Sequence, residues 1–323
     1  MRIAVTGRHY AAETAHLLST YLRLLGRDIE VGVLSEQEIA NALVNGTALP
    51  AIETLVFSGF KTLGQPANEA EKNSFKTFAQ FFAAATAAQA VINVNDSSGA
   101  HLAKRAQGEV VRYSSEYGQT ADWYLAVTNH NINAVSFAMQ GPEDGYLRGR
   151  LATFSTDLAT AAGLALATLA TVGVPIAEIA AMLKNVGSLE VDCGARLSAA
   201  QTAPLLVEHN IVGLVYLRDL LDALTDVAPG EVRIVLDAET VAARCDAKES
   251  AMIGAQAAHS GHLLYVACET AQNVREGIAA SGGRAQVSYY TSVSEAKVAA
   301  GANCDASTVV LYAGEITNAP LTA

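Results

Sequence analysis

The residues that could carry out chemistry begin at the first turn of the chain. Gly7 ends a short apolar stretch, and Arg8, His9 and Tyr10 follow it before an amphipathic segment that begins at Ala11. Free N–H groups at the start of a helix attract anions, so a glycine turn in this position is typical of a phosphate site. A P-loop also needs a second glycine for close backbone approach and a Lys that reaches the phosphates. Neither follows Gly7 here. We therefore expect a changed ligand with Arg8, His9 and Tyr10 as candidate contacts, although Arg8 could equally be a solvated loop residue.

A second group of polar residues follows an apolar segment. Residues 90–96, A-V-I-N-V-N-D, read as a strand that ends at Asn95 and Asp96. Parallel α/β sheets bind their ligands at the carboxyl ends of the strands, so Asn95 and Asp96 are candidate ligand contacts. The alternative is that Asp96 or Ser97 only caps the helix expected over residues 98–107.

Strands and helices alternate through the first half of the chain. The pattern predicts strands over residues 2–7, 28–34, 54–59, 90–96 and 109–114. Helices are expected over residues 11–25, from Ser35, over 72–88 and over 98–107. This alternation predicts a parallel, doubly wound sheet. Three further strands over residues 123–128, 134–140 and 146–151 are separated by turn residues and predict an antiparallel flank.

The second half of the chain repeats the alternation. Strands are expected over residues 232–236, 262–268, 286–290 and 308–313, with helices over 247–259, 270–280 and 293–301. The sequence thus predicts two domains, residues 1–192 and 193–323. His259 and His262 lie between a helix and a strand, but two histidines without a spaced Cys or carboxylate are a weak metal signal, so we interpret them as loop residues.

Composition limits the classes of partner. The 323 residues are 51% hydrophobic and 16% charged, which is typical of folded domains, and the net charge of −11 disfavours nucleic acid or an anionic membrane as partner. No stretch reaches roughly 18 consecutive apolar residues, and Met1 leads directly into a strand, so we expect a cytoplasmic protein. The four cysteines are scattered and are expected to be reduced and buried.

Three motifs resemble one enzyme family, the Mur ligases, and above all the muramyl-tripeptide synthetases. The first motif is V-T-G at residues 5–7 followed by T-A-H-L-L at residues 14–18, which resembles the family's ATP-binding V-T-G-T-N-G-K-T-T-T-A-H-L-L. The second is A-V-I-N-V-N-D at residues 90–96, which resembles the family's A-V-I-N-A-D-D. The third is L-R-G-R-L at residues 147–151, which resembles the family's L-x-G-R-F. Without a gap, the second loop glycine falls on Tyr10, the phosphate-binding Lys on Ala11 and the Thr beside Mg²⁺ on Ala12. The third motif places Gly149 and Arg150 at the nucleotide cleft.

Other features of the family have no counterpart. An insert of roughly fifty residues that carries a Mg²⁺-holding Glu is missing before residue 54, as is the family's D-H motif. The start of the family's third domain is matched only by Val215–Leu224, where its histidine falls on Asp219.

The resemblance implies an α/β fold, with a Mur-ligase-like central P-loop-type parallel-sheet domain followed by a Rossmann-like C-terminal domain. It implies a protein that has lost ATP-dependent ligase activity and acts as a binding, regulatory or scaffolding partner in cell-wall or amino-acid-ligation pathways. We accordingly expect no catalytic residue, no metal and no cofactor. The alternative is a diverged ATP-dependent carboxylate–amine ligase that uses ATP and Mg²⁺ and forms an amide through an acyl phosphate.

A small ligand or a protein partner is expected in the inter-domain cleft, bordered by Gly7, Asn95, Asp96 and Arg150. The sequence does not distinguish self-association into a homo-oligomer from regulation of a true Mur ligase or scaffolding of a complex.

Overall fold

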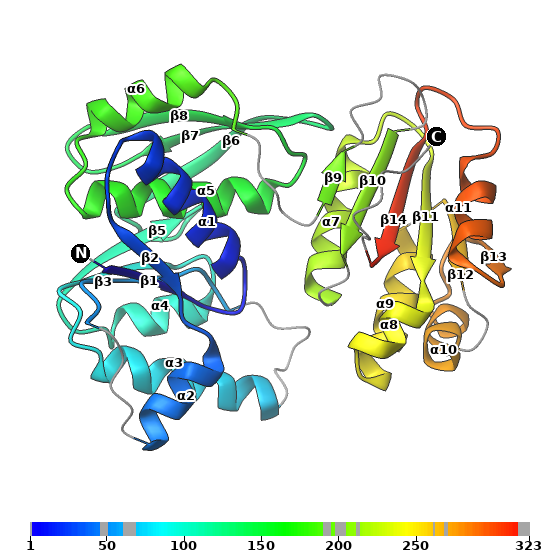
Figure 1. Ribbon diagram of the computed structural model, residues 1–323, viewed down its shortest axis with the longest axis horizontal. Coiled ribbons are helices and arrows are strands. Elements are labelled where there is room, and N and C mark those ends of the chain that lie inside the picture. The colour runs from blue at the N-terminus through cyan, green and yellow to red at the C-terminus, as the bar shows by residue number, and fades with distance from the viewer. Residues whose placement is uncertain are drawn as a thin grey trace. The chain divides into compact units, whose positions relative to one another are not determined.

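The computed structural model describes residues 2–45, 51–60, 69–189, 195–197, 205–210, 214–260, 262–267 and 271–315 (Figure 1). The chain divides into two compact units, Met1–Val191 and Asp192–Ala323. The sequence places this boundary between residues 192 and 193. None of the described helices is long and apolar enough to cross a membrane.

The first unit is built on one eight-stranded sheet with the order β2-β1-β3-β4-β5-β6-β7-β8. Its strands are β1 (Arg2–Thr6), β2 (Glu30–Val33), β3 (Thr54–Phe57), β4 (Gln89–Asn93), β5 (Glu109–Ser114), β6 (Trp123–Asn131), β7 (Ala134–Gln140) and β8 (Tyr146–Leu151). Strands β1 to β6 pair in parallel, and β6, β7 and β8 pair antiparallel. The predicted parallel sheet with an antiparallel flank is confirmed.

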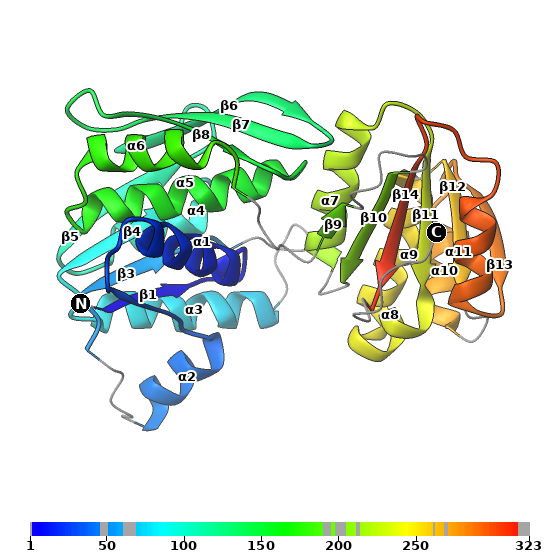
Figure 2. The same cartoon turned by 45° about the horizontal axis from the view of Figure 1, so that its top comes forward.

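Helices cover both faces of this sheet. They are α1 (Ala11–Leu24), α2 (Glu36–Asn45), α3 (Glu69–Ala84), α4 (Ser97–Ala103), α5 (Thr156–Thr171) and α6 (Ile176–Val186). Helices α1 and α5 pack on each other over one face, and α3 and α4 lie on the other (Figure 2). Phe57 of β3 contacts Phe78 and Phe82 of α3 edge to face, so these phenylalanines form the core, as their helical spacing predicts.

Two predicted strand ends are wrong by several residues. Strand β4 ends at Asn93 and not at residue 96, because the Asn93 side chain accepts the backbone N–H of Asn95 and turns the chain. Strand β6 continues to Asn131, beyond the predicted end at residue 128. The Asn131 side chain accepts the N–H groups of Asn133 and Ala134 and closes a shorter turn than expected.

The second unit has a six-stranded sheet with the order β13-β12-β11-β14-β10-β9. Its strands are β9 (Ala195–Leu197), β10 (Leu205–Asn210), β11 (Val232–Asp237), β12 (Leu263–Ala267), β13 (Gln286–Tyr290) and β14 (Val309–Gly314). Its helices are α7 (Leu214–Val227), α8 (Ala238–Arg244), α9 (Ala247–Ser260), α10 (Gln272–Ala280) and α11 (Val293–Gly301). All strands except β9 pair in parallel. The unit is the expected Rossmann-like domain.

Four elements of the second unit were not predicted, namely β9, β10, α7 and α8. The segment Val215–Leu224, which was matched to the start motif of the family's third domain, lies inside α7, and β9 and β10 of the same unit precede it. Asp219 lies in this helix. His262 accepts a hydrogen bond from the backbone N–H of Val232 at 3.0 Å.

The cysteines that the structure describes are free thiols. Cys245 and Cys304 are half-buried and not fully buried as predicted. Cys193 and Cys268 lie outside the described residues.

Candidate functional site

The strand order of the first unit produces a natural crevice. The chain leaves β1 toward β2 on one side of the sheet, whereas β3 and β4 continue on the other side. In open parallel sheets, ligands bind outside the carboxyl ends of the strands at such a reversal. The segments that follow β1 and β3 therefore meet at the expected position of a binding site.

These two segments are held together by the backbone. Ser58 donates from its N–H and from its hydroxyl to the carbonyl of Thr6, at 2.9 Å and 3.1 Å, and the N–H of Arg8 donates to the carbonyl of Gly59 at 3.0 Å. Gly7 lies at φ +131°, where a Cβ would stand 2.4 Å from the Ser58 hydroxyl. Only glycine fits this crossing without strain, which explains the residue at the end of β1.

Tyr10 fixes the start of α1. It adopts a left-handed conformation with φ 54° and ψ 30°, and its ring is 9% exposed. The carbonyl of Tyr10 accepts both the N–H and the hydroxyl of Thr14, at 2.9 Å and 2.7 Å. The next residue, Ala11, is buried against the unit.

A cavity of about 180 Å³ opens at this crevice. Its wall comes from the residues after β1, β3, β4 and β5 and from the first turns of α5. All of these residues belong to the first unit. The cavity is larger than the ~10–15 Å³ that one water molecule needs and smaller than the ~300–1,000 Å³ of pockets for drug-sized ligands. It has room for a small molecule.

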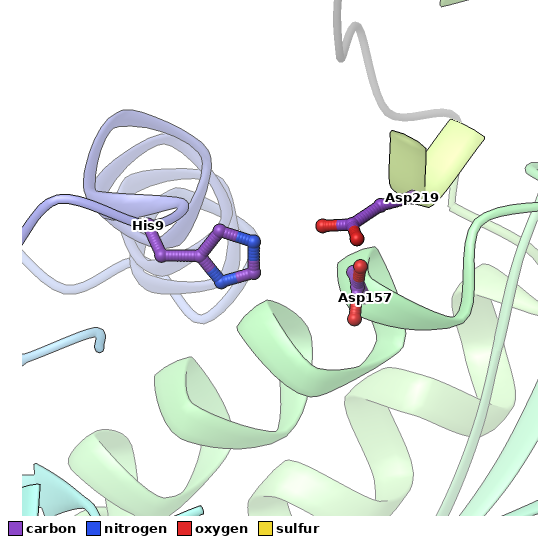
Figure 3. Close-up of side chains that lie close together, drawn as sticks. All are labelled: His9, Asp157 and Asp219. Carbon is purple, nitrogen blue, oxygen red and sulfur yellow. The ribbon is translucent and has the colours of Figure 1, made fainter. Parts of the chain in front are cut away.

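The charged groups of the wall are mostly carboxylates. His9 from the β1–α1 loop, Asp96 after β4, Glu116 after β5 and Asp157 in the first turn of α5 line the cavity. Ring nitrogen and carboxylate oxygen of His9 and Asp157 lie within 4.8 Å of each other, and Figure 3 shows the imidazole pointing toward this carboxylate. Asp219, also labelled there, belongs to α7 of the second unit.

The Asp96 carboxylate accepts backbone N–H groups from two segments. One carboxylate oxygen accepts the N–H of Gly99 at 2.7 Å and caps α4, and the other accepts the N–H of Phe60 at 3.2 Å. Burial raises the pKa of the Asp96 carboxyl, and these hydrogen bonds together with nearby His9 only partly offset that rise. Asp96 therefore caps α4, as one interpretation predicts, and it also lines the cavity; its role as a ligand contact stays a prediction.

Asn95 organises the rear wall. Its side-chain oxygen accepts the Ser114 hydroxyl at 3.0 Å and the Ser115 N–H at 2.8 Å, and its amide donates to the Ser115 hydroxyl at 2.8 Å. The Ser115 hydroxyl also contacts that of Thr160 at 2.9 Å. This network joins the ends of β4 and β5 to helix α5.

The structure gathers four of the seven predicted site residues. His9, Tyr10, Asn95 and Asp96 line the cavity. Gly7 shapes the loop behind it.

The other two predicted residues lie outside the lining. The Arg8 guanidinium stands 5.6 Å from the centroid of the Phe60 ring, so this side chain has an aromatic partner. Arg150 is an exposed residue of β8. The prediction of a partner bound between the two domains stays a prediction.

Several wall residues were not predicted from the sequence. Glu116 follows the carboxyl end of β5, so the rule that identified Asn95 could also have found it. Ser58 follows β3 in the same way. Asp157 and Thr160 lie on α5, and their position depends on how this helix packs on α1, for which the sequence carries no local signal.

His9 and Asp157 bring two possible metal ligands of the first unit within 4.8 Å of each other. Two side chains are fewer than the three or four protein ligands of a typical transition-metal centre. The absence of a metal therefore stays a prediction.

Comparison with known proteins bears on the fold. No family model and no curated protein sequence matches this chain. Among solved structures, a pseudomurein peptide ligase type C from Methanothermus fervidus has a TM-score of 0.74 at 12% identity, over 97% of this chain and 76% of that one. MurF from Acinetobacter baumannii has a TM-score of 0.70 at 14% identity, over 97% and 73%.

A third structure extends the comparison beyond peptide ligases. The bifunctional folylpolyglutamate synthase/dihydrofolate synthase from Yersinia pestis, complexed with AMPPNP and a Mn ion, has a TM-score of 0.67 at 16% identity, over 97% and 86%. At these identities the likeness concerns the arrangement of the chain and not its chemistry. The resemblance seen in the motifs is confirmed at this level, and the chain has a Mur-ligase-like fold.

Proposed function

We propose that this chain has lost ATP-dependent ligation and acts through binding, as a regulatory or scaffolding partner in cell-wall or amino-acid-ligation pathways. The observation that carries the proposal is the segment between β1 and α1. Tyr10, Ala11 and Ala12 stand where the ATP-binding motif has its glycine, Lys and Thr. The ring of Tyr10 is nearly buried and Ala11 faces the core, so this segment supplies neither the open backbone nor the cation that a triphosphate needs.

The charge of the cavity supports the same proposal. Phosphoryl transfer depends on positive groups that neutralise the phosphate oxygens. Among the described residues, neither Lys nor Arg lines this cavity, whereas three carboxylates do; Lys61 lies outside the described residues. At an effective dielectric constant of about 20, two like charges about 5 Å apart repel by about 3 kcal/mol. The wall therefore disfavours a triphosphate.

The alternative is a diverged ATP-dependent carboxylate–amine ligase. One observation favours it: three carboxylates line the cavity, and any of them could contribute an oxygen ligand to the Mg²⁺ of MgATP, which would neutralise part of the charge on ATP. In that case the nucleotide would be held through the metal and not through a loop Lys.

Calorimetric titration with MgATP distinguishes the proposed loss of ligation from the ligase alternative. We expect no binding tighter than the millimolar range. A micromolar dissociation constant, about 8 kcal/mol of binding free energy, that disappears in His9→Ala would contradict the proposal and support the ligase. Glu109→Gln is the control, because Glu109 lies at the amino end of β5 and the cavity lies at the carboxyl ends of the strands.

A further inference from the structure

The edges of the two sheets differ in how they are protected. Among the strands that the structure describes, the edge strands are β2 and β8 in the first unit and β9 and β13 in the second. An edge strand presents unpaired backbone N–H and C=O groups, and proteins usually protect it with a charged residue, Pro, a bulge or a very short strand. Glu30 lies in β2, Arg148 and Arg150 lie in β8, and β9 is only 3 residues long. Strand β13 is the remaining edge.

Strand β13 lacks each of these protections. Its sequence, Gln-Val-Ser-Tyr-Tyr at residues 286–290, contains no charged residue and no Pro, and its pairing with β12 is regular. Its side chains are exposed or half-buried, whereas β11 and β14 are buried throughout. Helix α11 packs on β12 and β11 more than on β13, at the end of the sheet (Figure 1). Strand β13 is therefore an accessible, uncharged edge.

The backbone of β13 has a defined outer side. The N–H of Gln286 donates to the carbonyl of His262, which precedes β12, at 3.1 Å. The backbone groups of successive strand residues point to opposite sides, so Gln286, Ser288 and Tyr290 face β12. Val287 and Tyr289 consequently direct their N–H and C=O groups outward, where none of the described strands pairs with them.

From this edge, we propose that β13 pairs antiparallel with β13 of a second copy of the chain, about a two-fold axis at Ser288. In this register, Val287 of each copy lies opposite Tyr289 of the other. Both residues direct their backbone groups outward, so each pair exchanges its N–H···O=C bonds and every outward group of the strand is used. Registers centred on Val287 or Tyr289 instead place one outward residue opposite residue 285 or 291, beyond the strand.

The side chains of the pairing also fit. Residues directly opposite in an antiparallel pair lie on the same face, and an aromatic residue opposite a β-branched one stabilises the pair. Tyr289 is 39% exposed, and in this register its ring reaches Val287 of the other copy. The inference does not depend on the proposed function, because β13 belongs to the second unit and the cavity to the first.

The charges at the ends of the strand favour a second copy over another protein. The exposed Arg284 lies opposite Ser292 of the other copy in this register. The Glu295 carboxylate stands at that end of the strand, because it accepts the hydroxyl of Thr291 at 2.6 Å. The two-fold axis thus brings Arg284 of each copy toward Glu295 of the other. Both members of this charge pair come from this chain, so the edge is complementary to itself.

The test is sedimentation equilibrium of the full chain over a range of protein concentrations. One strand pair is smaller than the ~1,200–2,000 Å² of stable interfaces, so we expect a reversible dimer with a dissociation constant on the order of 10–100 µM. A chain that stays monomeric up to about tenfold above this range would overturn the proposal. Growth into larger species without a discrete dimer would also overturn it, because it would indicate head-to-tail pairing of different edges.

Substitutions at Ser288 test the position of the axis. The two Ser288 side chains face each other in a close pair, so Ser288→Lys and Ser288→Glu each place like charges opposite one another. Each variant alone should dimerise at least about tenfold more weakly than the unchanged chain. An equimolar mixture of the two should restore dimerisation, because Lys then lies opposite Glu. Dimerisation of either variant as strong as that of the unchanged chain would place the interface elsewhere and overturn the proposal.

Val287→Pro tests the hydrogen bonds without adding charge. It removes an N–H that points outward and leaves the bonds to β12, and Pro is tolerated on an edge strand in this orientation. It should weaken the dimer at least about tenfold, with circular dichroism showing that the second unit stays folded. A folded Val287→Pro chain that dimerises like the unchanged chain would overturn the proposal, whatever the outcome at Ser288.

Val33→Lys is the matched control for the added charge. Val33 is 46% exposed in β2, the edge strand of the first unit, which this pairing does not use. Its dimer dissociation constant should stay within about twofold of that of the unchanged chain, because distant charges are largely screened at physiological salt. A loss as large as that of Ser288→Lys would reduce the effect to net charge and overturn the proposal.

Discussion

Replacing Gly7 by alanine tests the geometry on which the candidate site depends. Gly7 ends β1 at φ +131°, in a region that L side chains rarely adopt. An added Cβ would stand 2.4 Å from the Ser58 hydroxyl and 2.9 Å from the Gly59 carbonyl. The substitution therefore strains the backbone and forces apart the two segments that form the crevice.

The expected loss in the free energy of unfolding has two parts. Holding a residue with a side chain at such a dihedral costs about 1–3 kcal/mol. Overpacking against a neighbour that cannot move freely costs about 1–3 kcal/mol more. We therefore expect Gly7→Ala to lower the free energy of unfolding of the first unit by about 2–6 kcal/mol, a large share of the ~5–15 kcal/mol that a typical domain possesses.

The single tryptophan makes the unfolding of the first unit measurable. Trp123 belongs to the first unit, is 4% exposed, and packs its ring against Gly141. Its fluorescence during urea denaturation therefore reports the unfolding of this unit. Equilibrium transitions of the unchanged and substituted chains give the difference in the free energy of unfolding directly.

Two further variants separate the two parts of the cost. Gly173 has φ +89° and no heavy atom within 4 Å of its would-be Cβ, so Gly173→Ala measures backbone strain alone. In a Ser58→Ala background the hydroxyl contact is gone, and Gly7→Ala should then cost about 1 kcal/mol less. If Gly7→Ala costs no more than Gly173→Ala, the close approach of the two segments is not what requires glycine, and the reasoning is refuted.

Two predictions concern the second unit, followed by circular dichroism with the Trp123 transition as an internal reference. Arg233 donates to the carbonyls of Ala300 and Ala302 at 2.9 Å and 2.6 Å, so Arg233→Met should cost about 1–3 kcal/mol by leaving the buried Ala300 carbonyl unpaired, and an unchanged transition would contradict this. Hydrogen bonds from Ser307, and then from Thr308, lower the pKa of Asp305 in the folded state. The stability that Asp305 contributes is therefore present above its unfolded pKa of about 3.9 and is lost as pH falls through the folded value. Asp305→Asn should remove that pH dependence, and a difference from the unchanged chain that does not shrink toward pH 3 would count against it.

The sequence predicts most of the sheet of the first unit because the strands are short apolar runs separated by strong turn residues. Residues 109–114, 134–140 and 146–151 form strands with the expected ends. The predicted end of β4 is too late because the β-branched Val94, between Asn93 and Asn95, is compatible with a longer strand. The hydrogen bond from the Asn95 N–H to the Asn93 side chain ends it earlier, and such a local side-chain bond competes with the ladder.

The sequence likewise predicts only some of the residues of the candidate site. Asn95 and Asp96 could be found from the sequence because a general rule places ligand contacts after parallel strands. Asp157 could not, because its approach to His9 depends on the packing of α5 against α1, which joins segments roughly 150 positions apart in the sequence. Arg150 was predicted by resemblance and lies on an exposed position of β8, outside the cavity.

In the first unit, the buried strand residues that stabilise the fold are different from the residues that line the cavity. Ile3, Val5 and Val56 are fully buried in β1 and β3, and their packing is independent of what the following segments bind. The segments after these strands need only a glycine at the crossing and a cap for the next helix. The chain has a left-handed Tyr10 and a buried Ala11 after β1, and the sheet forms with them. This is why an extended likeness to ligases is compatible with a cavity wall that carries three carboxylates and, among the described residues, neither Lys nor Arg.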